Sequence, residues 1–183
     1  LDAFDKSGIS KNSRHRLEHC LLPSKKAMQR MAKLGVSPSF HINHLWYYGE
    51  ALEDHIIGRE RTDKILPLKA AENNSLIFSL HADQPMFESD PLSLLHTAVN
   101  RKTRDGKIIG KPNKISVEQG LKSLTIYAAW QIKMENKIGS IKPGKYADFV
   151  IIDQNPMMVD PDKIKDIHVL QTIVNGNIIY NKD

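Results

Sequence analysis

Strand-like and helix-like segments alternate over the first three quarters of this 183-residue sequence, and this order limits the possible folds more than any other feature. The strand-like runs lie at 15–20, around 39–46 and at 75–81. Helix-like runs follow them at 25–34, near 50–57, at 61–71 and after the pair Asp90-Pro91, whose residue types suit an N-cap and a first helical position. The alternation predicts three β-α repeats of an α/β fold with a parallel sheet.

Three repeats are too few for a closed barrel. An eight-stranded α/β barrel takes about 250 residues, which is more than the whole sequence contains. The repeats therefore form either the final part of a larger barrel or a small open sheet. The sequence begins at Leu1 in what reads as the middle of a helix, so we expect a fragment of a longer chain, and an upstream secretion signal stays an open alternative.

The last part of the sequence has a different pattern. Ser116-Val-Glu-Gln119 fits a capping box and predicts one more helix, with apolar residues at helical spacing behind it. A Pro-Gly turn at 142–145 then precedes strand-like runs at 147–152, 168–174 and 177–180. The last two are joined by Asn175-Gly176, a strong hairpin signal because both residue types tolerate positive φ. The tail is predicted to be a small β module.

Composition is that of an ordinary globular chain, with 40% hydrophobic residues, 26% charged residues and a net charge of +5. No run approaches the roughly 20 apolar residues that span a bilayer, and the basic residues are scattered without a nucleic-acid motif. We therefore expect neither a membrane nor a nucleic acid as partner. Cys20 is the only cysteine, which excludes an internal disulfide and leaves the compartment open, with the cytoplasm favoured.

Two of the predicted strands end at potential metal ligands. His19 closes the segment Arg14-His-Arg-Leu-Glu-His-Cys20, and Asp83 lies in Ser79-Leu-His-Ala-Asp-Gln-Pro85. In barrels of parallel strands, catalytic groups come from the C-terminal strand ends. A histidine and an aspartate at such ends predict half of a metal-hydrolase site. Two plainer interpretations stay open: His19 as a hydrogen-bonded structural residue, and Asp83 as an Asx cap of a turn.

Five motifs occur in an order that resembles the amidohydrolase superfamily, specifically amidohydrolase family 3. The resemblance runs over essentially the whole chain and ends on the segment from Val174 to Tyr180. The motifs are Arg14-His-Arg-Leu-Glu-His19, Phe78-Ser-Leu-His-Ala-Asp-Gln-Pro85, Asp90-Pro-Leu, Ala98-Val-Asn-Arg101 and Gly139-Ser-Ile-Lys-Pro-Gly-Lys-Tyr-Ala-Asp-Phe149.

The resemblance implies a metal-dependent hydrolase with a distorted, TIM-like (β/α)8 barrel and a β-sandwich built from both chain ends. Residues 1–137 would be barrel units six to eight, and residues 138–183 would be sandwich strands completed by a missing N-terminus. The family's other metal ligands should lie upstream. The resemblance implies inactivity of the isolated piece, and the barrel edge left open could pair with a second copy to give a homo-oligomer.

The same resemblance implies a role for each matching residue. His19 matches a strand-six metal ligand, and Asp83 matches the strand-eight aspartate that binds the metal and accepts a proton from the attacking water. The implied cofactor is a divalent metal, with zinc favoured, and the implied reaction is hydrolysis of a C–N bond in a small amide or N-acyl substrate. The alternative is a non-catalytic regulatory or binding protein on the same scaffold, like an exoenzyme regulator.

Other polar residues are weaker candidates. A spacing of three does not place His41 and His44 on one face of a strand, so a metal site that uses both is not expected unless the strand ends between them. His44 and Trp46 either contact the substrate or pack in the core, and His81 either contacts the substrate or supports a ligand. Arg61 and Arg101 are each expected to anchor a helix by a salt bridge, with an anion contact as the alternative. The remaining histidines are interpreted as structural or surface residues: His15, His55, His96 and His168.

Overall fold

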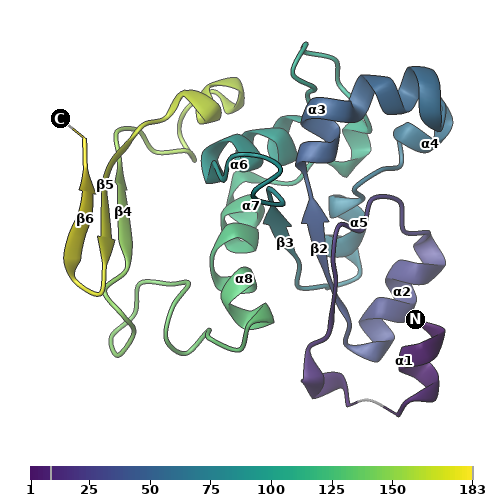
Figure 1. The fold of residues 1–183 in the computed structure, drawn as a ribbon, viewed down its shortest axis with the longest axis horizontal. Helices are drawn as coiled ribbons and strands as arrows, with labels where there is room; N and C mark the ends of the chain where they lie inside the picture. Colours follow the sequence, from purple (N-terminus) through teal and green to yellow (C-terminus); the bar gives the residue numbers. More distant parts are fainter. Residues whose placement is uncertain (9, 183) are drawn as a thin grey trace.

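The computed structural model describes residues 1–8 and 10–182, and in these residues six strands form two three-stranded sheets (Figure 1). The first sheet is parallel, with the order β1-β2-β3, and helices connect its strands. The second sheet is antiparallel, with the order β4-β5-β6. Helices α6, α7 and α8 lie between the two sheets in Figure 1. The prediction of an α/β fold with a parallel sheet followed by a β module is confirmed.

The parallel sheet brings the ends of its strands into line. Its strands are β1 (Arg16–Leu17), β2 (Ser37–His41) and β3 (Ser79–His81). The register pairs His41 with His81, which makes these two residues neighbours at the C-terminal edge. Because the strands are parallel, the loops that follow them leave from the same edge of the sheet.

The predicted second strand at 39–46 is wrong in its second half. Strand β2 ends at His41, and helix α3 (Asn43–Ala51) begins two residues later, so His44 and Trp46 lie on a helix. The local sequence is rich in apolar and aromatic residues and fits either state. Tertiary packing decides for the helix, because Leu45 and Gly49, four residues apart, are both buried.

The helices begin where the sequence places caps. The Ser24 hydroxyl accepts a hydrogen bond from the amide of Ala27, and the Ser116 hydroxyl accepts one from the amide of Gln119. The Asp90 carboxylate accepts from two amides at the start of its helix. The helices not yet given are α1 (Asp2–Lys6), η1 (Lys11–Ser13), α2 (Lys25–Leu34), η2 (Leu52–Ile56), α4 (Arg59–Thr62), α5 (Leu68–Asn73), α6 (Pro91–Asn100), η3 (Lys111–Asn113), α7 (Val117–Leu124), α8 (Ile126–Gln131) and η4 (Pro161–Asp166).

Two predicted helices are interrupted. The expected helix at 61–71 is two short helices, α4 and α5, separated by a segment that contains Pro67. Proline disfavours a helical conformation at the residue before it and lacks an amide hydrogen for the helix ladder. The helix after Ser116 breaks at Thr125, between α7 and α8.

The main core lies between the parallel sheet and the helices that cover it. Phe40 of β2 and Phe78, just before β3, are fully buried and meet edge to face, with ring centroids 5.6 Å apart. Arg101 is also fully buried, and its guanidinium donates hydrogen bonds to the carbonyls of Ile109, Leu66 and Ile65. The expectation that Arg101 anchors its helix by a salt bridge is therefore wrong, because backbone carbonyls are its partners.

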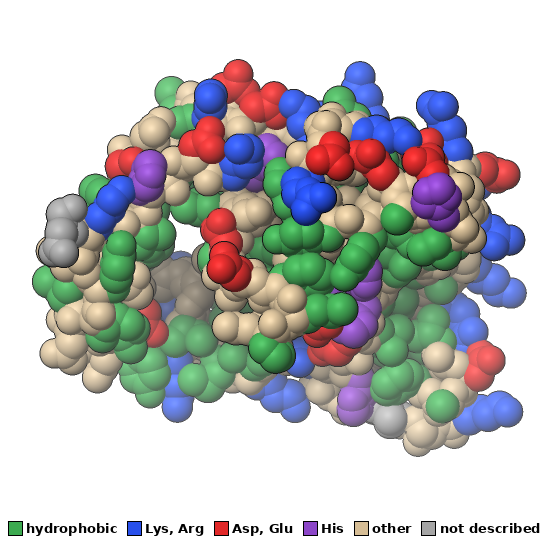
Figure 2. Space-filling view, turned by 45° about the horizontal axis from the view of Figure 1, so that its top comes forward, with side chains coloured by type: hydrophobic (Ala, Val, Ile, Leu, Met, Phe, Trp, Pro, Cys, Tyr) green, Lys and Arg blue, Asp and Glu red, His purple; other side chains and the backbone are tan. Residues whose placement is uncertain are grey.

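The antiparallel sheet consists of β4 (Phe149–Ile152), β5 (Val169–Val174) and β6 (Asn177–Asn181). The predicted hairpin is confirmed, with Asn175 and Gly176 at φ values of 49° and 79°. An open groove of about 860 Å³ lies between this sheet and the α/β part, and Figure 2 shows the hollow. None of the helices in the described part of the chain has the length and apolar character needed to span a membrane.

Candidate metal centre

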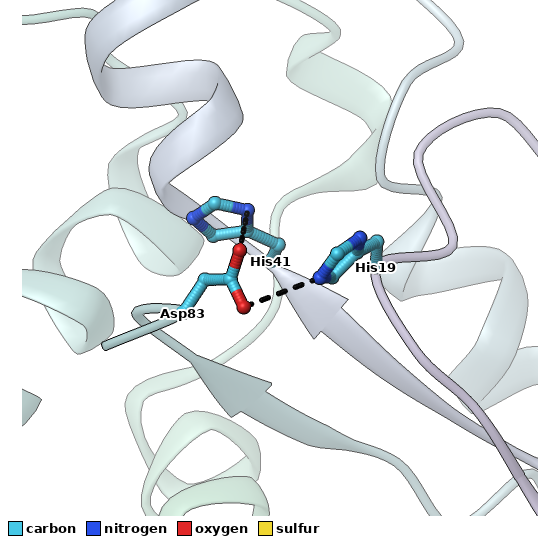
Figure 3. Close-up of side chains that lie close together, drawn as sticks. All are labelled: His19, His41 and Asp83. Carbon is cyan, nitrogen blue, oxygen red and sulfur yellow. Dashed lines mark ion pairs between the residues drawn. The ribbon is translucent and has the colours of Figure 1, made fainter. Parts of the chain in front are cut away.

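Three side chains from three parallel strands converge at the C-terminal edge of the sheet. His19 follows β1, His41 is the last residue of β2, and Asp83 lies two residues beyond β3 (Figure 3). Their potential ligand atoms all lie within 4.8 Å of one another. His19 Nε2 is 3.3 Å from Asp83 Oδ1, and His41 Nδ1 is 3.9 Å from Asp83 Oδ2. The sheet brings together residues that are far apart in sequence because parallel strands end side by side.

Two of these residues have an unusual backbone. His19 and Asp83 have φ values of 66° and 60°, in the left-handed region that residues with a side chain rarely adopt. Such conformations cost on the order of 1–3 kcal/mol each and concentrate at functional sites, where the surrounding structure maintains them. Seven other non-glycine residues of the described chain also have positive φ, so the case for a functional role rests on the convergence of the side chains and not on the backbone conformation.

The Asx-cap interpretation of Asp83 finds no support. Among the hydrogen bonds of the described residues, none runs from a backbone amide to the Asp83 carboxylate, whose close partners are the two histidines. The hydrogen bond and the charge of His19 hold the pKa of Asp83 below its ordinary value. Asp83 is therefore a carboxylate at neutral pH, which is the form that binds a cation.

His41 is the most deeply buried member of the cluster, with 1% of its surface exposed. Burial, together with the neighbouring His44 and His81, lowers its pKa to about 4, so the imidazole is neutral at physiological pH. Neither of its ring nitrogens has a hydrogen-bond partner among the described residues. Since buried polar atoms nearly always have a partner, a cation bound to one of these nitrogens would satisfy an atom that is otherwise left alone.

The donor set fits a divalent metal. Two imidazoles and one carboxylate are the kinds of ligand that zinc and related ions bind through nitrogen and oxygen, and catalytic zinc sites commonly use three protein ligands. The sequence alone did not assign His41 to this group. The available signal was the end of the strand itself, because His41 is the last residue of β2 and α3 begins two residues later.

Two further histidines crowd the cluster. The His81 ring lies 5.4 Å from that of His19 and 5.2 Å from that of His41, measured between centroids. The His44 ring lies 4.1 Å from that of His41 and 6.1 Å from that of His19. Burial lowers the pKa of both His44 and His81. Both are placed to contact a molecule bound at the cluster, and their roles stay predictions.

Trp46 lies elsewhere. Its ring meets that of His96 edge to face, with centroids 5.6 Å apart, and His96 is buried with 2% exposure. His96 therefore has the packing role expected for it. His168, just before β5, forms an exposed pair with Asp153, with Nδ1 and Oδ2 3.0 Å apart. Cys20 is half-buried and its Sγ donates to the carbonyl of Leu17, while burial raises the pKa of its thiol to about 11.

The protein therefore has an α/β fold whose parallel sheet carries a candidate metal centre, formed by two histidines and an aspartate at or just beyond the strand ends. Residues 1–180 match the sequence profile of the Amidohydrolase family, and the chain belongs to that family. The resemblance found in the motifs is thereby confirmed.

Known proteins similar to this chain include enzymes with named activities. N-substituted formamide deformylase of Arthrobacter pascens is 26% identical over 184 residues, which cover 100% of this chain and 34% of the relative. The crystal structure of an uncharacterized metal-dependent hydrolase from Pyrococcus horikoshii matches with a TM-score of 0.73 and 24% identity, over 87% of this chain and 32% of that one. An adenosine deaminase from Xanthomonas campestris with bound zinc matches with a TM-score of 0.68 and 18% identity, over 95% of this chain and 38% of the deaminase chain. The chain thus spans about a third of the length of the first curated relatives.

Proposed function

We propose that this chain supplies His19 and Asp83 to the metal centre of a metal-dependent amidohydrolase that hydrolyses amide or N-acyl C–N bonds of small molecules. The observation that carries the proposal is the convergence of His19, His41 and Asp83 at the ends of three parallel strands. Family membership supports it, as do relatives that include a deformylase and a zinc-containing deaminase.

The proposal includes the architecture. The parallel sheet would be units six to eight of a (β/α)8 barrel, with the boundary near residue 137, and β4, β5 and β6 would belong to a β-sandwich. Support comes from the share of the relatives that the chain covers, about a third, and from the location of the candidate ligands at strand ends. The other barrel strands would supply further ligands.

Each residue has a chemical task in this proposal. The divalent metal, for which we favour zinc, would activate a water and polarise the scissile carbonyl when bound. His19 offers a nitrogen ligand on a backbone fixed by the end of β1. Asp83 would help to hold the cation, accept a proton from the attacking water and pass it to the leaving nitrogen. His41 is neutral and buried, so its imidazole can bind a metal ion without first losing a proton.

The test is the metal content and the amide hydrolysis of the full-length protein. We expect wild type to bind a divalent metal, and Asp83→Asn to abolish hydrolysis while the fold is retained. His19→Ala should weaken metal binding at least about tenfold, because loss of a group that only supports a ligand already costs that much. The matched control is the exposed His168–Asp153 pair, because His168→Ala removes a histidine with a close carboxylate partner far from the site. A full-length wild type without metal would refute the proposal, and binding of a partner without hydrolysis would support the regulatory alternative.

A further inference from the structure

Three aromatic rings form a surface beside the candidate metal centre. Tyr47 and Tyr48 lie on α3, and Phe87 lies in the loop after β3. The Phe87 ring stacks on that of Tyr47, with centroids 4.5 Å apart and an interplanar angle of 14°, and it meets the Tyr48 ring edge to face at 5.9 Å. We call Tyr47, Tyr48 and Phe87 the aromatic shelf.

The shelf is continuous with the metal-binding cluster. The Phe87 ring lies 5.4 Å from the ring of His41, and the Tyr48 ring lies 6.2 Å from the ring of His44. This proximity follows from the topology, because α3 begins just after β2 and the Phe87 loop begins just after β3. Both shelf segments therefore leave the sheet at the edge that carries His41 and Asp83.

The shelf is open to solvent in the described structure. Tyr47 is 44% exposed and Tyr48 is 37% exposed, and the neighbouring Met86 is 61% exposed. Figure 2 shows histidine side chains among hydrophobic ones near the middle of one face of the molecule. Grouped apolar side chains at a surface are a common mark of a binding site. Tyrosine rings suit such a site because they offer a large apolar face with little conformational freedom to lose.

We propose that the aromatic shelf binds an aromatic group of the substrate, carried on the nitrogen or acyl side of the scissile C–N bond. The assignment rests on the proposed function, because it needs the reacting bond to sit at His19, His41 and Asp83. A ring on the substrate would extend the stack that Phe87 and Tyr47 already form, and offset stacking and edge-to-face contacts are favourable beyond the area that they bury. The preferred substrates are therefore amides with a benzyl-type substituent rather than small aliphatic ones.

The test compares two probes that share the same amide and differ in one substituent. Calorimetric titration of the full-length protein in the Asp83→Asn background, which should not turn over the amides, with N-benzylacetamide and N-methylacetamide should give about tenfold tighter binding of the benzyl probe. Phe87→Ala should remove most of this preference and leave the affinity for the methyl probe and the metal content unchanged. Phe87 is partly buried and packs against the core, so its replacement also affects packing. The second variant is therefore Tyr48→Ala, which removes an exposed ring. Tyr146→Ala is the control, because Tyr146 is 49% exposed and lies outside the shelf.

The outcomes separate this inference from the proposed function. Equal affinity for the two probes, or a benzyl preference that survives both Phe87→Ala and Tyr48→Ala, would overturn the shelf while metal binding and hydrolysis could still hold. Loss of the preference in both variants, with metal content unchanged, would support the shelf. A benzyl preference in a protein whose wild type binds no metal would refute the proposed function and with it the assignment of the bound ring to a substrate.

Discussion

Replacing Arg101 by methionine should destabilise the α/β part strongly. Its guanidinium is fully buried and donates to the carbonyls of Ile109, Leu66 and Ile65 at 3.0, 3.0 and 2.9 Å. Methionine keeps most of the side-chain length and leaves the three carbonyls without this donor. A hydrogen bond from a charged group contributes roughly 1.5–3 kcal/mol, and the replacement regains part of the cost of burying a charge. We therefore expect a net loss of about 3–5 kcal/mol in the free energy of unfolding.

The same contacts connect Arg101 to the candidate site. The amide of Leu66 donates to the carbonyl of Leu21, the residue that directly follows the left-handed pair His19-Cys20. Arg101 thus holds the segment that in turn holds the loop of His19. Loss of the guanidinium should therefore weaken metal binding as well as stability, since His19 would lose support for its unusual backbone conformation.

The assay is urea denaturation of wild type and Arg101→Met, followed by circular dichroism, with metal content measured in parallel. The matched control is Arg104→Met, because the side chain of Arg104 is 66% exposed and its change should stay within about 0.5 kcal/mol. Arg101→Lys should recover only part of the stability, since an ammonium lacks the planar fork that serves three carbonyls. A loss below about 1 kcal/mol in Arg101→Met would refute the reasoning.

Three further predictions concern pH, capping and assembly. The pKa of His41 is lowered from 6.5 to about 4, so its contribution is complete above pH 6.5 and is lost as the pH falls toward 4. With metal removed by a chelator, this loss should total roughly 3 kcal/mol, and equal pH slopes of the unfolding free energy in wild type and His41→Leu would contradict it. Ser116→Ala should lower the unfolding free energy by about 1 kcal/mol, because the Gln119 amide loses its cap. Equal urea midpoints for the variant and wild type would contradict this prediction. The isolated chain should self-associate through the open β1 edge, and light scattering that finds only a 20.8 kDa species at every concentration would rule this out.

Local sequence signals predicted the elements whose ends are set locally. Helix α2 runs from Lys25 to Leu34, as expected, because Ser24 caps its start and Gly35, at a φ of 69°, ends it. The hairpin at Asn175-Gly176 follows from the same kind of signal. These boundaries depend on the conformational preferences of a few consecutive residues, so no distant contact is needed to predict them.

Local signals do not predict the boundary between β2 and α3. The residues around His41 and His44 fit a strand or a helix equally well, and the choice depends on distant partners. His41 pairs with His81 on β3, and α3 approaches the segment after α6 so closely that a Cβ on Gly49 would lie 2.8 Å from Ile109 and Thr103 side-chain atoms. Neither contact can be read from the local sequence.

The sequence by itself determined the family, the α/β order, and the location of His19 and Asp83 at predicted strand ends. Only the tertiary structure decided that His41 lies with them, that His81 and His44 surround them, and that an aromatic shelf borders the cluster. The physical reason is that neighbouring parallel strands are joined by long connections, so the residues at their ends become neighbours only when the sheet forms.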